Sequence, residues 1–209
     1  MPRGRHGLSR EFVTQNQLDR LLASIAECLH EHGYDGTTVS LITANAKVSK
    51  SDFYRHFSSK DECFVAAYDH AVEQLRQEVL AACAAAEEWA EGVTGALASV
   101  LAYMAREPSR ADLLLVEGLR AGPDVYTRFQ GAVQSFVPYL RDGAPAPQGA
   151  QPPASGVAEA VVGGVASLLS HWVLAGQTEE VEQFLPEVAE FALTPYLGSA
   201  AARRVGSGG

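Results

Sequence analysis

Helical periodicity dominates this sequence, and the signals of β-strands are nearly absent from it. No segment alternates apolar and polar residues over the length of a strand, and no Asn-Gly hairpin occurs. Near the N-terminus, apolar residues recur at the spacing of an amphipathic helix: Leu18, Leu21, Leu22, Ile25, Ala26 and Leu29. With 47% apolar residues the chain can bury a core. The sequence therefore predicts an all-α fold.

Caps and breakers divide the chain into about nine expected helices. The first ends at His32-Gly33, and the second runs from a Thr37-Thr38 cap to about Asn45. The third begins at Ser49 and ends near Phe57, and the fourth begins at Ser59, whose spacing to Glu62 is that of a capping box. The others are expected at 87–106, 109–121, 124–141, 156–176 and 179–197.

Charge is distributed unevenly along the chain. The total of 16 basic and 25 acidic residues gives a net charge of −9, which by itself argues against nucleic-acid binding. Residues 1–60, however, hold 8 basic and 6 acidic residues, a net of +2, whereas residues 61–209 hold 8 and 19, a net of −11. The basic end and the acidic body indicate two different tasks.

Several classes of protein are disfavoured. Cys28, Cys63 and Cys83 lack a C-x-x-C pair and fit a reducing cytoplasm, where they act as small apolar residues. No signal peptide is expected, and the uncharged stretch from Ala160 to Gly176 is expected to be too short and too polar to span a membrane. No H-E-x-x-H, G-x-S-x-G or Walker motif occurs. We therefore expect no enzyme activity, no metal and no cofactor.

Residues 37–60 predict two short helices joined by a tight turn. Val39, Ile42 and Ala46 line one side of the first helix, and Phe53 and Phe57 line one side of the second, so both can pack on helix one. The second helix then exposes hydroxyls, a phenol and cations, which suit the major groove of DNA: Lys50, Ser51, Tyr54 and Arg55, with His56 beside them and Lys60 just beyond. Lys60 lies in the first turn of the fourth helix, where the side chain and the helix N–H groups can share one phosphate.

This segment resembles the DNA-binding domain of the TetR (tetracycline-repressor-like) family of bacterial transcription regulators. The matching residues are Glu31-His32-Gly33-Tyr34, Thr37-Thr38-Val39, Val48-Ser49-Lys50, Phe53-Tyr54-Arg55-His56-Phe57 and Ser59-Lys60. A looser resemblance continues through Leu113–Pro123 and Leu193–Gly198, so that it covers roughly residues 12–198. It implies a helix-turn-helix at about 38–57 within a DNA-binding domain at 10–60. A ligand-binding and dimerisation domain is implied at 61–198.

The resemblance also implies which residues act. The expected DNA-contacting residues are Thr38, Lys47, Ser49, Lys50, Ser51, Asp52, Tyr54, Arg55, His56 and Lys60. For His56, a phosphate contact and a structural hydrogen bond stay open as alternatives. A ligand pocket in the acidic body is expected among Trp89, Tyr103, Met104, Glu117, Phe129, Phe136, Tyr139, His171 and Trp172. Each of these is also compatible with ordinary core packing, and Glu117 with a structural ion pair.

A homodimer interface is implied by the resemblance for the last two expected helices. The candidate contacts are Val161, Gly164, Val165, Leu168, Val181, Phe184, Leu185, Val188 and Phe191, with burial inside one subunit as the alternative. Residues 142–156 carry four of the ten prolines and are expected to form a flexible loop, and residues 199–209 a disordered tail.

Three residues depart from the family pattern. Lys47 replaces the usual glycine of the tight turn, where positive φ costs a side chain about 1 kcal/mol, and its cation would face DNA. Asp52 replaces a small or hydroxyl residue. It either forms a capping box with Ser49 or contacts a base such as cytosine. Thr43 replaces alanine, and its hydroxyl can bond back to the preceding turn.

The sequence thus predicts a cytoplasmic, homodimeric, ligand-responsive transcription regulator of TetR type. The expected action is that of a repressor that releases a palindromic double-stranded operator when a small molecule binds. The alternative is a helical small-molecule-binding protein that keeps the fold without specific DNA binding. Lys47 and Asp52 are the two residues that favour this alternative.

Overall fold

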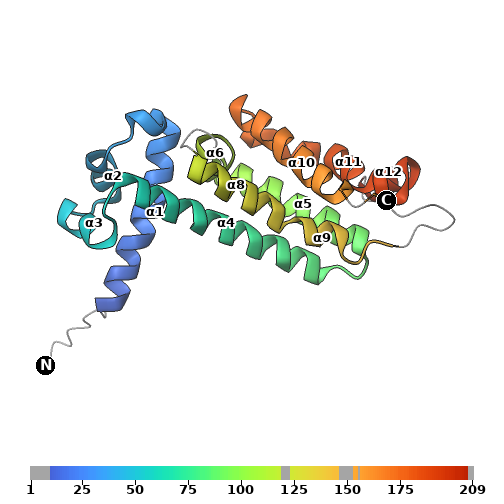
Figure 1. The fold of residues 1–209 in the computed structure, drawn as a ribbon, viewed down its shortest axis with the longest axis horizontal. Coiled ribbons are helices and arrows are strands. Elements are labelled where there is room, and N and C mark those ends of the chain that lie inside the picture. Colours follow the sequence, from blue (N-terminus) through green and yellow to red (C-terminus); the bar gives the residue numbers. More distant parts are fainter. Residues whose placement is uncertain (1–9, 119–122, 146–152, 155, 207–209) are drawn as a thin grey trace, which may run out of the picture. The chain divides into compact units, whose positions relative to one another are not determined.

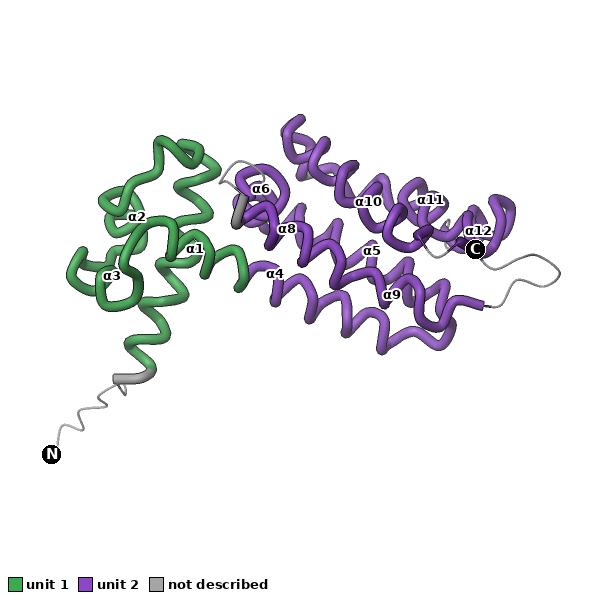
Figure 2. Tube along the Cα trace, viewed as in Figure 1, with its two compact units in different colours: residues 1–70 green, residues 71–209 purple. Residues whose placement is uncertain are grey.

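The computed structural model describes residues 10–118, 123–145, 153–154 and 156–206. In this part of the chain every regular element is helical, which confirms the predicted all-α class (Figure 1). The chain divides into an N-terminal unit, residues 1–70, and a C-terminal unit, residues 71–209 (Figure 2). The expected boundary at residue 60 is ten residues too early, because Cys63, Phe64, Ala67 and Tyr68 are buried within the N-terminal unit.

The N-terminal unit contains three helices and the beginning of a fourth. They are α1 (Arg10–Gly36), α2 (Val39–Ala46), α3 (Lys50–His56) and the first part of α4 (Lys60–Ala85). Gly33 breaks α1 with φ 67° and ψ 174°, at the position where the sequence predicted the end of the first helix. Thr38 and Ser49 are the N-caps of α2 and α3, also as predicted.

The core of the N-terminal unit is built from the amphipathic stripe of α1. Large apolar side chains from each helix are at most 1% exposed: Leu21, Ile25, Leu29, Ile42, Phe53 and Phe64. Burying each of them contributes about 1.5–3 kcal/mol relative to leaving it in water. This core holds α2 and α3 on α1, so that their outer faces are fixed in place.

The C-terminal unit contains the rest of α4 and a series of shorter helices. They are α5 (Trp89–Arg106), α6 (Pro108–Asp112), the π-helical turn η1 (Leu113–Glu117), α8 (Pro123–Ser135), α9 (Val137–Arg141), α10 (Val157–Leu174), the 3-10 helix η2 (Thr178–Phe184), α11 (Leu185–Leu197) and α12 (Ser199–Gly206). Two apolar clusters hold them together. One joins α5, α9, α10, α11 and α12, and the other joins α5, α6, η1, α10 and η2.

Three of the predicted helices are broken in the structure. The helix expected at 109–121 changes from α6 into a π-helical turn, the one at 124–141 is interrupted at Phe136, and the one at 179–197 begins as a 3-10 helix. Proline explains the last two breaks. Pro138 and Pro186 lack a backbone N–H, and each lies in the first turn of the helix that follows. Helices α5 and α10 lie close to their expected ranges.

The prediction of a disordered tail after Gly198 was wrong for Ser199–Gly206, which forms α12. Ala202 is fully buried, and Gly206 lies so near α11 that an added β-carbon would be 3.0 Å from the Pro186 carbonyl oxygen. Arg203 Nε donates to Glu190 Oε1 at 2.6 Å. The small residues that suggested a tail are those that let α12 pack closely on α11. The last three residues lie outside the described part of the chain.

The expected loop at 142–156 lies partly outside the described residues. Its described ends, 142–145, 153–154 and Gly156, are turn or irregular.

Helix α10 carries much of its apolar surface on the outside. Among the described helices it alone is long and apolar enough to cross a membrane by length and composition, which corrects the expectation that this segment is too short and too polar. One third of it is buried within the C-terminal unit, whereas Leu168 and Leu174 are exposed.

Candidate functional site

Helices α2 and α3 form a helix-turn-helix whose geometry is fixed by local hydrogen bonds. The Thr38 hydroxyl accepts from the Leu41 N–H at 3.3 Å, and the Ser49 hydroxyl accepts from the Asp52 N–H at 3.0 Å. Between the helices, Lys47 has φ 53° and ψ 44°, the one non-glycine residue with positive φ in the described part of the chain. The turn predicted at this lysine is therefore confirmed, together with its left-handed backbone.

One buried and one exposed side-chain hydrogen bond connect α2 to α1, and a third lies within α2. The buried Ser24 hydroxyl donates to the Ile42 carbonyl at 2.8 Å, and Asn45 Nδ2 donates to Glu27 Oε2 at 2.6 Å. The Thr43 hydroxyl donates to the Val39 carbonyl at 2.8 Å, the bond to the preceding turn that the sequence predicted. The buried hydrogen bond from Ser24 resists any shift of α2 along α1, because breaking it leaves an unsatisfied polar group.

The outer face of α3 presents four of the predicted DNA-contacting side chains. Lys50, Ser51, Tyr54 and Arg55 are exposed, at spacings that place them on one side of a helix. Tyr54 is 58% exposed while its ring packs edge-on against Phe53, with 5.4 Å between the ring centroids. Thr38, Lys47 and Ser49 are exposed as well, and His56 is half-buried. This surface offers cations, hydroxyls and a phenol to a partner.

Asp52 uses both carboxylate oxygens within α3. Oδ2 accepts from the Ser49 hydroxyl at 2.7 Å, and Oδ1 pairs with Arg55 Nη2 at 2.5 Å. Ser49 is the N-cap of α3, and Asp52 holds the Ser49 hydroxyl and pairs with Arg55, so its position fits the capping role, while a base contact stays a prediction. Asp52 therefore offsets part of the positive charge of α3 and holds the Arg55 guanidinium in one orientation.

Lys60 does not extend freely towards a partner. Its ammonium donates to the Tyr34 carbonyl at 2.7 Å and lies 3.9 Å from the centroid of the Tyr34 ring. The Tyr34 hydroxyl donates to Asp61 Oδ1 at 2.6 Å, and burial followed by this bond raises the pKa of Tyr34 to about 12. Lys60 thus joins the end of α1 to the start of α4, a structural role that the sequence did not indicate, and its phosphate contact stays a prediction.

The start of α4 has a modified form of the predicted capping box. The Ser59 hydroxyl accepts from the Glu62 N–H at 3.1 Å, as expected, but the Glu62 carboxylate accepts from the Ser58 N–H at 2.6 Å instead of returning to Ser59. The Ser58 hydroxyl also donates to the Glu62 carboxylate at 2.6 Å, and the two hydrogen bonds from Ser58 lower the pKa of Glu62. The helix N-terminus is therefore capped by the protein itself.

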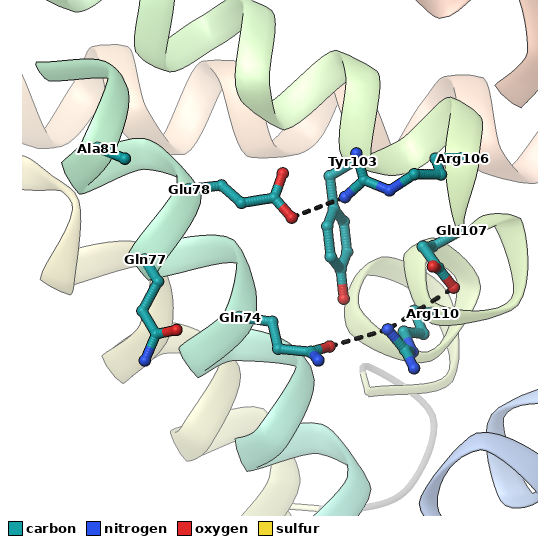
Figure 3. Close-up of a pocket in the computed structure, with 8 residues that line it drawn as sticks. All are labelled: Gln74, Gln77, Glu78, Ala81, Tyr103, Arg106, Glu107 and Arg110. Atoms are coloured by element: carbon teal, nitrogen blue, oxygen red, sulfur yellow. Dashed lines mark hydrogen bonds and ion pairs between the residues drawn. The ribbon is translucent and has the colours of Figure 1, made fainter. Parts of the chain in front are cut away.

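A cavity of about 420 Å³ lies within the C-terminal unit (Figure 3). Its walls come from α4, from the end of α5 and from α6, and they are mostly polar: Gln74, Gln77, Glu78, Ala81, Tyr103, Arg106, Glu107 and Arg110. Arg106 Nη2 pairs with Glu78 Oε1 at 2.6 Å, and Arg110 Nη1 donates to Gln74 Oε1 at 2.8 Å. Of the nine predicted ligand residues, Tyr103 alone lines this cavity.

The other predicted ligand residues lie elsewhere. Met104 belongs to the apolar cluster that joins α5, α6, η1, α10 and η2, and Trp172 packs against that cluster. Trp89 packs against the cluster that joins α5, α9, α10, α11 and α12. Trp172 stacks on Phe184 at 4.6 Å, Phe136 contacts Tyr139, and Phe129 contacts Tyr126. Glu117 is buried and His171 is exposed. Aromatic content does not reveal the polar lining of this cavity, whose signal in the sequence is the spacing of Gln74, Gln77, Glu78 and Ala81 on one side of α4.

The predicted dimer residues divide by burial. Val161, Val181 and Val188 are at most 5% exposed and belong to this chain's own core, which corrects their assignment to an interface. Gly164, Val165, Phe184 and Leu185 are half-buried. Leu168 and Phe191 are exposed at 39% and 44%. A β-carbon at Gly164 would lie 2.9 Å from Phe191 Cζ, so this glycine lets α10 and α11 approach each other within one subunit.

Among the described residues, no group of three or more His, Cys, Asp and Glu side chains could hold a metal ion. Burial raises the pKa of the Cys28, Cys63 and Cys83 thiols, so their reactive thiolate forms are disfavoured. The candidate sites are therefore the outer face of the helix-turn-helix and the polar cavity.

The fold and the first of these sites define a helix-turn-helix protein with a second, all-helical unit. Residues 21–67 match the family model described as bacterial regulatory proteins, tetR family. An uncharacterized HTH-type transcriptional regulator of Mycobacterium tuberculosis (strain ATCC 25618 / H37Rv) is 42% identical over 55 residues, which is 26% of this chain and 27% of the relative. Residues 21–67 are therefore similar to the DNA-binding segment of the tetR family, and the match to these relatives spans about a quarter of their length.

Solved structures share the whole fold at low sequence identity. The fatty acid degradation regulator FadR from Bacillus halodurans is similar with a TM-score of 0.74 and 14% identity, over 86% of this chain and 94% of that chain. FadR from Bacillus subtilis, solved in complex with stearoyl-CoA, has a TM-score of 0.73 and 13% identity, over 86% and 98% of the two chains. The family and its matching relatives are described as regulators, not as enzymes, in agreement with the sequence prediction.

Proposed function

We propose that this protein is a transcription regulator that binds a palindromic DNA operator through α3. The observation that carries the proposal is the exposed face of Lys50, Ser51, Tyr54 and Arg55 on a helix anchored by a buried core. Arg and Lys pair with guanine or phosphate, and hydroxyls add hydrogen bonds to bases or backbone. Thr38, Lys47 and Ser49 lie near the ends of α2 and α3 and supply phosphate contacts.

The regulator acts as a homodimer in this proposal. One short helix reads only a few base pairs, whereas a twofold pair of helices reads two half-sites about 34–36 Å apart. The exposed apolar residues of α10 and α11, Leu168, Leu174 and Phe191, supply the surface that a second copy covers. Burial in a dimer also accounts for an α10 that is as apolar as a membrane span in a DNA-binding chain.

A small molecule bound in the C-terminal unit releases the operator, which makes the protein a repressor. Helix α4 begins at Lys60 in the N-terminal unit and ends at Ala85 in the C-terminal unit, so it is the element through which binding can act on α3. The ligand must bind the released state more tightly than the DNA-bound state. A 100-fold loss of operator affinity needs about 2.7 kcal/mol of differential binding. Such a regulator works in the cytoplasm, where its DNA is.

A selection from fragments of the host genome tests the proposal and identifies the operator sequence in the same experiment. Wild-type protein should enrich a small set of fragments that share a twofold-symmetric sequence, protected from DNase I over two half-sites. The Lys50→Ala/Tyr54→Ala variant should lose this enrichment while it keeps the wild-type circular dichroism spectrum.

Equal enrichment of all fragments by the wild-type protein would contradict specific recognition. It would favour a ligand-binding protein that has kept the fold alone. The charge offset by Asp52 on α3 is the observation behind that alternative, and Asp52→Thr should then create specific binding.

A further inference from the structure

We propose that the cavity between α4, α5 and α6 binds a small organic acid, whose carboxylate accepts hydrogen bonds from the Tyr103 hydroxyl and the Arg110 guanidinium. This inference rests on the proposed function, because it names the chemical class of the effector. It concerns residues of the C-terminal unit alone, so the binding step can be tested without DNA.

The strongest evidence is a buried hydroxyl that has no partner in good hydrogen-bond geometry, although the Arg110 guanidinium lies close enough to it to affect its pKa. Tyr103 is 1% exposed, and its hydroxyl oxygen has no hydrogen-bond partner among the described residues. In Figure 3 the ring descends from α5 into the cavity, and the hydroxyl points towards the side where Gln74 and Arg110 lie. Buried polar groups are nearly always paired in folded proteins. A hydroxyl left unpaired at the wall of a cavity is therefore a place for a ligand atom.

The charge that acts most strongly on this hydroxyl is positive. Burial raises the pKa of Tyr103, the charge of the Arg110 guanidinium and its hydrogen bonding to the hydroxyl oppose that rise, and the carboxylates of Glu107 and Glu78 add to it to a smaller extent. Arg106 lies over the ring of the same tyrosine at 5.6 Å from its centroid, but its Nη2 is occupied by Glu78. The site at the hydroxyl consequently favours an anionic acceptor over a cation.

Arg110 has the hydrogen-bonding capacity for such an acceptor. Its Nη1 donates to Gln74 Oε1 at 2.8 Å and forms an ion pair with Glu107 Oε2 at 3.6 Å, a distance too long for a good hydrogen bond. A guanidinium carries five N–H donors in a planar fork, and a carboxylate matches that fork with two parallel bonds. The volume of about 420 Å³ is that of a site for a small molecule.

The same contact gives the ligand a way to act. The hydrogen bond from Arg110 to Gln74 connects α6 to α4. A carboxylate bound to Arg110 competes with Gln74 Oε1 for the guanidinium. Arg110 lies on α6, three residues before the π-helical turn Leu113–Glu117 begins, and such a turn often marks a functional position. Ligand binding would thus loosen α4 from α6 within the C-terminal unit.

Isothermal titration calorimetry on the full-length protein tests the inference with matched probes. Hexanoate and benzoate should bind, and each should bind at least about tenfold more tightly than hexanamide or benzamide, the loss expected for one charge-assisted hydrogen bond. Tyr103→Phe and Arg110→Gln should each weaken carboxylate binding by at least about tenfold. Tyr139→Phe removes a tyrosine hydroxyl from the same unit outside the cavity and should bind like wild type.

Several results would overturn the inference. The inference fails if neither carboxylate binds at millimolar concentration, if the amides bind as tightly as the carboxylates, or if Tyr103→Phe and Tyr139→Phe have equal effects. The operator assay keeps the two proposals apart. Operator binding without carboxylate binding refutes this inference alone, whereas carboxylate binding without any operator refutes the regulator proposal and leaves the site in place.

Discussion

Replacing Lys60 with methionine distinguishes a structural role for this residue from a phosphate contact. The substitution keeps the length of the side chain and removes the charge. In the structure the ammonium donates to the Tyr34 carbonyl at 2.7 Å and lies 3.9 Å from the centre of the Tyr34 ring. A charged hydrogen bond contributes about 1.5–3 kcal/mol and a cation–π contact at an exposed site about 0.5–1 kcal/mol. Because Lys60 is only half-buried, we expect a total loss of about 2 kcal/mol.

The assay combines unfolding with DNA binding. Urea unfolding followed by circular dichroism should show the loss of stability, and the thermal midpoint should fall by about 4–8 °C. The slope of log K against log salt for DNA binding should not change, because no phosphate contact is removed. Lys50→Met is the matched control. It removes the same charge from the exposed face of α3, so it should reduce the slope by about 0.9 per lost phosphate contact and leave stability unchanged.

The opposite pattern would refute this reasoning. If Lys60→Met keeps wild-type stability and reduces the salt slope by about 0.9 per lost contact, Lys60 is a phosphate ligand, as the sequence alone suggested.

Three further predictions follow from the N-terminal unit. Lys47→Gly should raise the free energy of unfolding by about 1 kcal/mol in urea titrations, because glycine accepts φ 53° without strain; equal gains from Lys47→Ala would contradict this backbone explanation. Asp52→Asn should free Arg55 and steepen the salt slope on random-sequence DNA by up to about 0.9 per subunit, and an unchanged slope would show that the ion pair does not restrain Arg55. Tyr34 has a pKa raised from 10.0 to about 12, so its contribution to stability is complete below pH 10 and is lost as the pH rises towards 12. The difference in thermal midpoint between wild type and Tyr34→Phe should therefore shrink over this range, and a constant difference would refute the assignment.

The helix-turn-helix was predictable because its signals are local. Thr38 and Ser49 cap their helices from three residues away, and the turn at Lys47 follows from the positions of its neighbours. The pairing of Asp52 with Arg55 also spans three residues, so it too lay within reach of sequence reasoning. Lys60 differs, because its partner Tyr34 lies 26 residues away and meets it only in the folded unit.

The C-terminal unit was less predictable because its details depend on packing between distant segments. The tail helix α12 forms because Ala202 and Gly206 fit against α11, which their small size alone does not reveal. The cavity takes its walls from three helices, and Tyr103 becomes an unpaired buried hydroxyl only through that arrangement. Aromatic content pointed to Trp89 and Trp172, which pack against the apolar clusters.

The most direct test of the regulator account is fluorescence anisotropy of the full-length protein with DNA from its own upstream region, over a series of salt concentrations. We expect sequence-specific binding at nanomolar protein, with an affinity that falls steeply as salt rises and is lost in the Lys50→Ala/Tyr54→Ala variant. Affinity no higher than for random DNA, there and for every fragment recovered by genomic selection, would contradict the account.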